Sequence, residues 1–234
     1  MKKVQNITAV LAMLFLITAI LITSVQLAVY GDSRYRFYEK EYDKYNVTES
    51  LGMEMEDVMD VTGHMMAYLI GEEEELSVLT DVDGERQDFF NDQDRAHMAD
   101  VKNLFLGGLK VRTVCLVIFV LLLLLLAVRK ADLKRLIPRA YSAGVGVFLA
   151  LVVLLGLLFA SDFTKYFEIF HEMFFTNDLW LFDPATDYMI RMLPEGFFSD
   201  MALRIVMMFL AGLALVGIVM IIWRAVVKKK ERQK

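Results

Sequence analysis

The chain has 234 residues, of which 57% are hydrophobic, and its formal net charge is −5. A hydrophobic share this large is more than a water-soluble domain of this length usually buries, so the composition excludes an ordinary soluble protein. No stretch of the sequence has a pattern typical of nucleic-acid binding, and we expect the basic C-terminal tail to contact anionic lipid instead.

The apolar residues cluster in four runs, each long or nearly long enough to cross ~30 Å of hydrocarbon at ~1.5 Å per residue. They predict transmembrane helices at about residues 7–30, 107–128, 140–160 and 201–223. The first run has about twice the apolar length of a signal peptide, and no cleavage motif follows it, so it is interpreted as a retained anchor. We therefore expect a mainly α membrane protein, a single membrane domain over residues 1–234, with a small extracytoplasmic α(+β) cap from residues 31–106 and 161–200.

Charge predicts how the chain crosses the membrane, because cytoplasmic segments retain Lys and Arg. Basic residues concentrate before the first helix, in the loop at 129–139 and in the tail from residue 224. By contrast, residues 31–103 hold 20 acidic and 7 basic side chains, and residues 161–200 hold 8 and 2. This asymmetry predicts a multi-pass membrane protein with both termini in the cytoplasm and the cap outside.

The first outer segment contains several local signals. Its aromatic-rich start, residues 35–45, suits extended structure at the level of the lipid headgroups. Apolar residues then recur at helical spacing and predict an amphipathic helix that ends near Gly71. The dipeptide Asp83-Gly84 indicates a short hairpin. A further helix is predicted to begin near Asn91 or Asp92, whose side chains can cap it.

Two histidines are the candidates for chemistry. His97 lies three residues before Asp100 on the predicted helix, so a carboxylate on the same face can orient the imidazole. In the second outer segment, Ser161 and Asp162 can cap a helix that carries His171 at the edge of an aromatic face. The third histidine, His64, has no motif around it and is interpreted as structural.

These stretches together resemble the bacterial lipoprotein intramolecular transacylases, a family of four-helix membrane enzymes with an extracytoplasmic cap. The resemblance rests on residues 97–102 (HMADVK), 170–184 (FHEMFFTNDLWLFDP) and 193–198 (LPEGFF). It implies that the sn-2 acyl chain of a diacylglyceryl-cysteine lipoprotein moves to the α-amino group of the same cysteine, giving a lyso-form lipoprotein without a cofactor. It also implies that His97 and His171 are the catalytic pair.

The residues suit this chemistry on physical grounds. An α-amino group with a pKa of ~8 must lose a proton before it attacks an ester, and a histidine can accept that proton. A second histidine can protonate the departing oxygen, and the sequence does not say which histidine does which; direct attack by a histidine on the ester is also open. The residues predicted to support the pair or line its pocket are Asp100, Phe170, Phe174, Asn177, Asp178, Trp180, Asp183 and Glu195.

The residues are also compatible with two other functions. One is a metal-dependent membrane hydrolase that uses imidazoles and outer carboxylates as ligands, although no H-E-x-x-H spacing occurs in the sequence. The other is a non-enzymatic membrane sensor or assembly protein whose acidic cap binds a ligand. The predicted partners of the transacylase are a diacylated lipoprotein and membrane lipid, with no metal.

Overall fold

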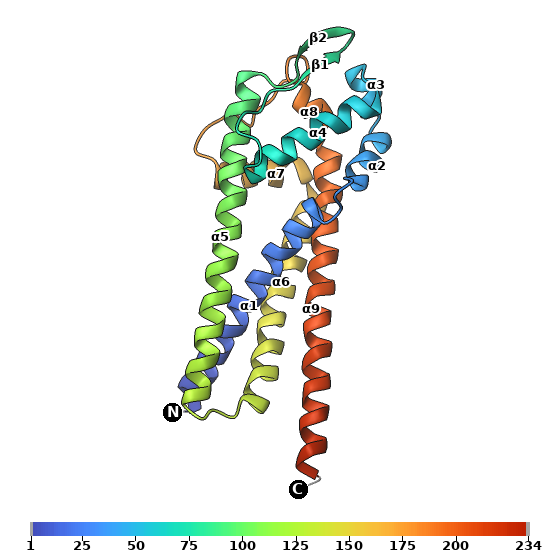
Figure 1. Ribbon diagram of the computed structural model, residues 1–234. Coiled ribbons are helices and arrows are strands. Elements are labelled where there is room, and N and C mark those ends of the chain that lie inside the picture. The colour runs from blue at the N-terminus through green and yellow to red at the C-terminus, as the bar shows by residue number, and fades with distance from the viewer. Residues whose placement is uncertain (1, 233–234) are drawn as a thin grey trace. The chain divides into compact units, whose positions relative to one another are not determined.

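The computed structural model describes residues 2–232 (Figure 1). Of the predicted basic tail from residue 224, the side chains of residues 227–234 lie outside the described residues. In chain order the elements are α1 (Lys2–Tyr30), α2 (Arg36–Lys44), α3 (Val47–Leu51), α4 (Met55–Ile70), β1 (Leu79–Val82), β2 (Glu85–Asp88), α5 (Asp92–Val128), α6 (Leu133–Ser161), α7 (Phe163–Phe174), α8 (Tyr188–Met192) and α9 (Glu195–Arg232).

The chain divides into two compact units. The first comprises Met1–Ala28, Leu109–Leu157 and Leu203–Lys234, and the second comprises Val29–Gly108 and Leu158–Ala202. Helices α1, α5, α6 and α9 contribute residues to both units, whereas α2, α3, α4, the two strands, α7 and α8 belong to the second unit alone. The predicted four helices are present, because α1, α5, α6 and α9 are each long and apolar enough to cross a membrane.

The first unit is a helical bundle with an apolar exterior. Small residues allow its helices to approach closely: a Cβ added at Gly144 would lie 2.8 Å from Ile17 Cδ1, and one added at Gly212 would lie 2.8 Å from Ile20 Cγ2. Its buried core consists of Ala9, Ala12, Met13, Ile17, Leu126, Ala140, Tyr141, Phe209 and Leu213. Many Leu, Ile and Val side chains point outward and are exposed. An apolar exterior of this kind requires a lipid environment, so the chain is an integral membrane protein.

Helix α5 joins two predicted elements in one continuous helix. It has 37 residues and is therefore about 55 Å long, nearly twice the hydrocarbon thickness. Its polar first turns thus precede the apolar run that spans the membrane. Its start confirms the predicted cap: Asp94 N donates to Asn91 Oδ1 at 2.9 Å, and Asn91 N donates to Asp94 Oδ2 at 3.0 Å. This reciprocal pair satisfies two backbone amides at the helix end.

The start of the second unit differs from the prediction. Residues 36–44 form helix α2, not extended structure. Tyr38 and Tyr42 are four residues apart, so a helix puts both rings on one face, where they lie 5.2 and 6.2 Å from the ring of Phe197. The Tyr42 hydroxyl is paired with Thr62 Oγ1 at 2.7 Å. Burial of these aromatic side chains outweighs their intrinsic preference for strands.

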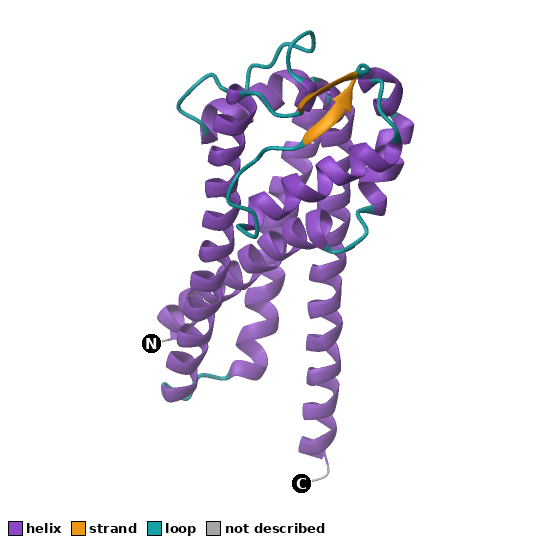
Figure 2. Cartoon of the chain, turned by 45° about the horizontal axis from the view of Figure 1, so that its top comes forward, coloured by secondary structure: helices purple, strands orange, loops and turns teal. Residues whose placement is uncertain are grey.

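The other local predictions for the second unit are confirmed. Helix α4 ends at Ile70 and is followed by Gly71, whose φ of 82° is the left-handed conformation typical of the residue that caps a helix C-terminus. Strands β1 and β2 form an antiparallel hairpin, drawn in orange in Figure 2. The turn residues Asp83 and Gly84 have φ of 53° and 81°, as a type I′ turn requires. Asp83 also accepts two hydrogen bonds from Arg191, which fixes the hairpin turn to the segment that contains α8.

Candidate active site

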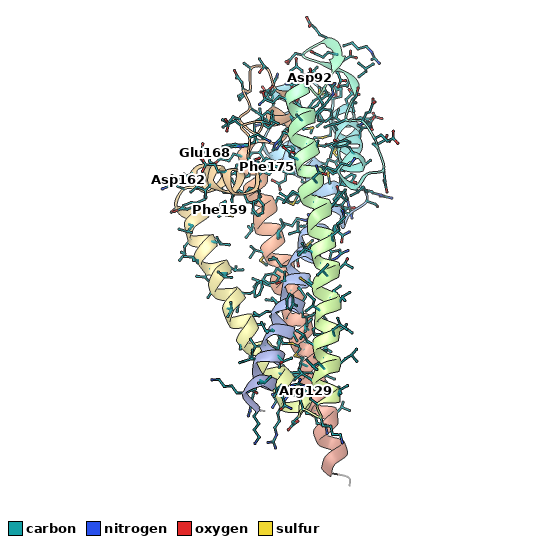
Figure 3. All side chains as sticks on the ribbon, turned by 90° about the vertical axis from the view of Figure 1, so that its left-hand side faces the viewer. Asp92, Arg129, Phe159, Asp162, Glu168 and Phe175 are labelled. Carbon is teal, nitrogen blue, oxygen red and sulfur yellow. The ribbon has the colours of Figure 1, made fainter. Side chains whose placement is uncertain are left out.

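The second unit brings His97 and His171 together. Their ring centroids are 6.1 Å apart, one on the polar start of α5 and the other on α7. Figure 3 labels Asp92, where α5 begins, and Phe175, which directly follows α7. The two histidines are far apart in the sequence, and a substrate group the size of one ester linkage can reach both rings.

Hydrogen bonding fixes the tautomer of His171. Its Nδ1 lies 2.7 Å from the carbonyl oxygen of Phe167, one turn earlier on α7. A carbonyl oxygen only accepts, so Nδ1 carries the proton in the neutral ring, and Nε2 keeps a lone pair that can take up a proton. The ring stacks on Trp180 at 5.0 Å and meets Phe167 edge-on at 4.5 Å. Burial lowers the pKa of His171 below its usual value, opposed by the bond to Phe167.

His97 has a drier environment. Its side chain is 7% exposed, and its ring meets the rings of Phe175 and Phe182 edge-on, each at 5.3 Å. Among the described residues, its buried Nδ1 has no hydrogen-bond partner. Burial, together with the neighbouring His171, lowers the pKa of His97 to about 4, although Asp100 acts in the opposite direction. The ring is therefore neutral at physiological pH and presents one N–H donor.

Asp100 supports the site differently from the prediction. Its Oδ2 accepts from Asn177 Nδ2 at 2.9 Å, so the carboxylate holds the amide rather than an imidazole. The backbone carbonyl oxygen of Asn177 accepts from Trp180 Nε1 at 2.8 Å. Because the Trp180 ring stacks on His171, this chain of bonds connects α5 to the wall beside the second histidine. Asp100 and Asn177 thus position Trp180, and the Asp178 carbonyl oxygen closes the same turn by accepting from Leu181 N at 3.1 Å.

A second connection fastens the start of α5 to the same loop. Asp187 is 5% exposed and accepts from Asn91 Nδ2 at 2.5 Å and from Asp183 N at 2.6 Å. Asp94 is fully buried, and burial raises its pKa to about 6, with a further contribution from the charge of Asp187. The loop that carries Trp180 and Phe182 is therefore tied to α5 on both sides.

Three of the predicted residues have other partners. Glu195 accepts from the Thr164 hydroxyl at 2.8 and 3.0 Å. Asp183 Oδ1 accepts from Ala185 N at 2.9 Å and closes a turn. Phe174 packs against Phe170, with ring centroids 4.8 Å apart, on an exposed side of α7.

The predicted site residues omitted two aromatic neighbours of His97, which are Phe175 and Phe182. The prediction favoured Phe174 over Phe175 because Phe174 continues the aromatic face of the helix. Helix α7 ends at Phe174, however, and the extended backbone of Phe175, with φ −120° and ψ 138°, turns its ring onto His97. Helical periodicity gave no signal for Phe175, because it places a side chain only while the helix continues, and α7 stops one residue before Phe175.

The remaining acidic and histidine residues do not gather in the same way. Among the side chains that the structure describes, no group of three His, Cys, Asp or Glu residues is arranged to hold a metal ion. His64 has a different partner, because its Nε2 lies 2.9 Å from the carbonyl oxygen of Glu75.

Membrane-spanning helices and two closely spaced histidines among aromatic rings are features of an integral membrane enzyme. The family model of lipoprotein intramolecular transacylase Lit matches residues 10–198. The chain therefore belongs to the lipoprotein intramolecular transacylase family, and it is an enzyme of that class.

Solved structures of one relative agree with this assignment. The structure of the transacylase Lit from Bacillus cereus is similar over 99% of this chain and 100% of that chain, with 25% identity and a TM-score of 0.76. A variant of the same protein with a histidine replaced by arginine is similar over 99% of this chain and 94% of that chain, with 25% identity and a TM-score of 0.72. A search of curated protein sequences gives no match.

Proposed function

We propose that this enzyme transfers the sn-2 acyl chain of a diacylglyceryl-cysteine lipoprotein to the α-amino group of the same cysteine, with His97 and His171 as the catalytic pair. The observation that carries the proposal is the 6.1 Å separation of the two rings within one aromatic site. The charge asymmetry of the sequence supports a site on the outer side of the bacterial cytoplasmic membrane, with cytoplasmic termini. Membership of the family supports a lipoprotein as the substrate.

The tautomer of His171 favours it as the base. Its Nε2 removes a proton from the substrate ammonium group, and the amine nitrogen then attacks the carbonyl carbon of the sn-2 ester. The tetrahedral intermediate collapses with cleavage of the bond between that carbon and the glycerol oxygen. The protonated His171 gives its proton to the glycerol oxygen. Its Nε2, neutral again, then takes the second proton of the amide nitrogen and passes it to water, so the ammonium group and the ester become an amide, an alcohol and one released proton.

His97 has a complementary role in this scheme. Its pKa of about 4 keeps the ring neutral while its neighbour is protonated. A neutral imidazole donates one hydrogen bond, which stabilises the negative charge on the carbonyl oxygen of the tetrahedral intermediate. Such a bond is strong in the dry surroundings that Phe175 and Phe182 provide.

The remaining catalytic contribution is the shape of the site. Donor and acceptor belong to one molecule, and well-oriented intramolecular reactions reach effective molarities of ~10⁵ M or more. Walls made of Phe167, Phe175, Phe182 and Trp180 hold the lipid headgroup folded and exclude the water that would otherwise hydrolyse the ester.

The proposal is tested with the purified protein and one defined diacylated lipopeptide. The migration is an isomerisation, so intact mass does not change, and tandem mass spectrometry must locate the acyl chain on nitrogen or oxygen. We expect His97→Ala and His171→Ala each to lower the rate by about 10² or more. The matched control is His64→Ala, because His64 lies in the same unit and outside the pair.

Each outcome has a defined meaning. An undiminished rate in either variant rejects the role of that histidine. A free fatty acid, with the corresponding loss of mass from the lipopeptide, would show hydrolysis instead of transfer. An unchanged lipopeptide after incubation with the wild-type protein would reject the proposed substrate.

A further inference from the structure

Helix α7 has an exposed apolar stripe. Ile169, Phe170, Met173 and Phe174 are 38%, 38%, 71% and 48% exposed. Their spacing of one, four and five residues puts them on one side of the helix, which we call the α7 stripe. Phe170 and Phe174 contact each other within it, with centroids 4.8 Å apart.

The other sides of the helix have different surroundings. Lys165, Glu168 and Glu172 are exposed and form a polar side. A third side faces the protein, where Phe167 lies 5.0 Å from the ring of Phe198 and His171 stacks on Trp180. The helix is thus divided into a protein side, a water side and an apolar side.

The short connection between α6 and α7 indicates what covers the apolar side of α7. Helix α6, which is apolar enough to cross a membrane, ends at Ser161, and α7 begins at Phe163. Asp162 alone separates them, and its Oδ1 caps α7 by accepting from Lys165 N at 3.2 Å. Helix α7 therefore begins within one residue of the end of a membrane helix. Aromatic residues at such a position are typical of the membrane interface.

We propose that α7 lies in the interface of the bilayer that α6 crosses, with the α7 stripe inserted among the lipid chains. Helices with one apolar and one charged side bind in this way, with the apolar side about 5–10 Å into the boundary between headgroups and acyl chains. His171 is on another side of the same short helix. A helix with its side chains is about 10 Å across, so this insertion holds the imidazole at headgroup depth, where the ester linkages of membrane lipids lie.

The position of α7 is tested without reference to catalysis. In a Cys115→Ala background, which removes the single cysteine of the sequence, a nitroxide label is attached at Met173→Cys and, as the matched control, at the neighbouring Glu172→Cys. Both proteins are placed in proteoliposomes, and collision rates with oxygen and with a water-soluble nickel chelate are measured. We expect the label at position 173 to collide mainly with oxygen and the label at 172 mainly with the chelate. Chelate accessibility at 173 equal to that at 172 would overturn the proposal.

A second experiment, which rests on the proposed function, measures the consequence for the reaction. Met173→Glu puts a charge into the stripe, and Met173→Leu keeps it apolar. For a long-chain diacylated lipopeptide in a bilayer, we expect Met173→Glu to raise KM about tenfold and Met173→Leu to behave as wild type. A short-chain, water-soluble lipopeptide should be converted equally by all three proteins. If Met173→Glu has a wild-type KM for the bilayer substrate, the stripe is not inserted.

The two experiments fail in different ways. If the wild-type protein converts neither lipopeptide, the proposed function is wrong, and the label accessibility still decides the position of α7. If the wild-type protein is active but position 173 is accessible to the chelate, the position of α7 is wrong and the reaction remains.

Discussion

Replacement of Asp94 by asparagine should make the protein more stable above pH 6. Asp94 is fully buried at the start of α5, and burial raises its pKa from 3.8 to about 6, although the bond from Asn91 acts in the opposite direction. A raised pKa in the folded state means that ionisation opposes folding. The contribution of Asp94 to the free energy of unfolding is therefore most favourable below pH 4 and falls as the pH rises from about 4 to about 6.

The size of the effect follows from the same values. Each pKa unit corresponds to about 1.4 kcal/mol, so ionised Asp94 costs roughly 3 kcal/mol at neutral pH. Asn keeps an oxygen that can accept from Asn91 N, and it removes the charge beside Asp187. For a chain of this length, the gain corresponds to about 6 to 12 °C in melting temperature.

The assay is thermal unfolding in detergent between pH 4 and pH 8, with Asp92→Asn as the control. Asp92 lies in the same first turn, but its carboxylate is exposed. We expect Asp94→Asn to melt above wild type at pH 7.5, with the difference vanishing near pH 4, and Asp92→Asn to lack this pH-dependent gain. A lower melting temperature for Asp94→Asn at pH 7.5, or the same pH dependence as wild type, would refute the reasoning.

Three further results are expected. Asn177→Ala removes the bond to a charged carboxylate that fixes the loop beside Trp180, so kcat should fall about tenfold and the tryptophan fluorescence should shift. Modification of His171 by diethyl pyrocarbonate, which requires the neutral ring, should reach half its maximal rate below pH 6.5, because burial lowers the pKa. Gly196→Ala should destabilise the protein by about 1–3 kcal/mol, because the new Cβ would overlap ring carbons of Tyr45.

Each of these predictions has a control variant or a result that would contradict it. Asn177→Asp retains the oxygen that accepts from Leu179 N but loses the amide donor, so full activity in this variant would show that the donor is unimportant. Half-maximal modification of His171 above pH 6.5 would contradict its buried environment. Gly107→Ala is the matched helical substitution, because an added Cβ there meets nothing within 4 Å, and it should not destabilise the protein. Equal melting temperatures for the two alanine variants would contradict the predicted clash.

Local physical chemistry made the secondary structure predictable. Long apolar runs leave the chain no alternative to spanning helices, since each backbone amide in lipid needs a partner within the same segment. Asn91 and Asp162 cap helices as expected, and Asp83-Gly84 forms the expected turn, because these interactions involve residues at most a few positions apart. Local pattern made His97 and His171 candidates separately, whereas the resemblance to the transacylase family predicted that they act as a pair.

The tertiary structure decided how these pieces work together. Tyr42 is helical because its ring is buried beside Phe197, a contact that strand preference does not include. Asp100 meets Asn177 instead of His97, although helical spacing made the imidazole the nearer candidate. The 6.1 Å approach of His97 and His171 likewise depends on how the chain folds between them. Spacing along a helix fixes neighbours within one turn, whereas contacts between distant segments depend on packing, which short-range pattern does not encode.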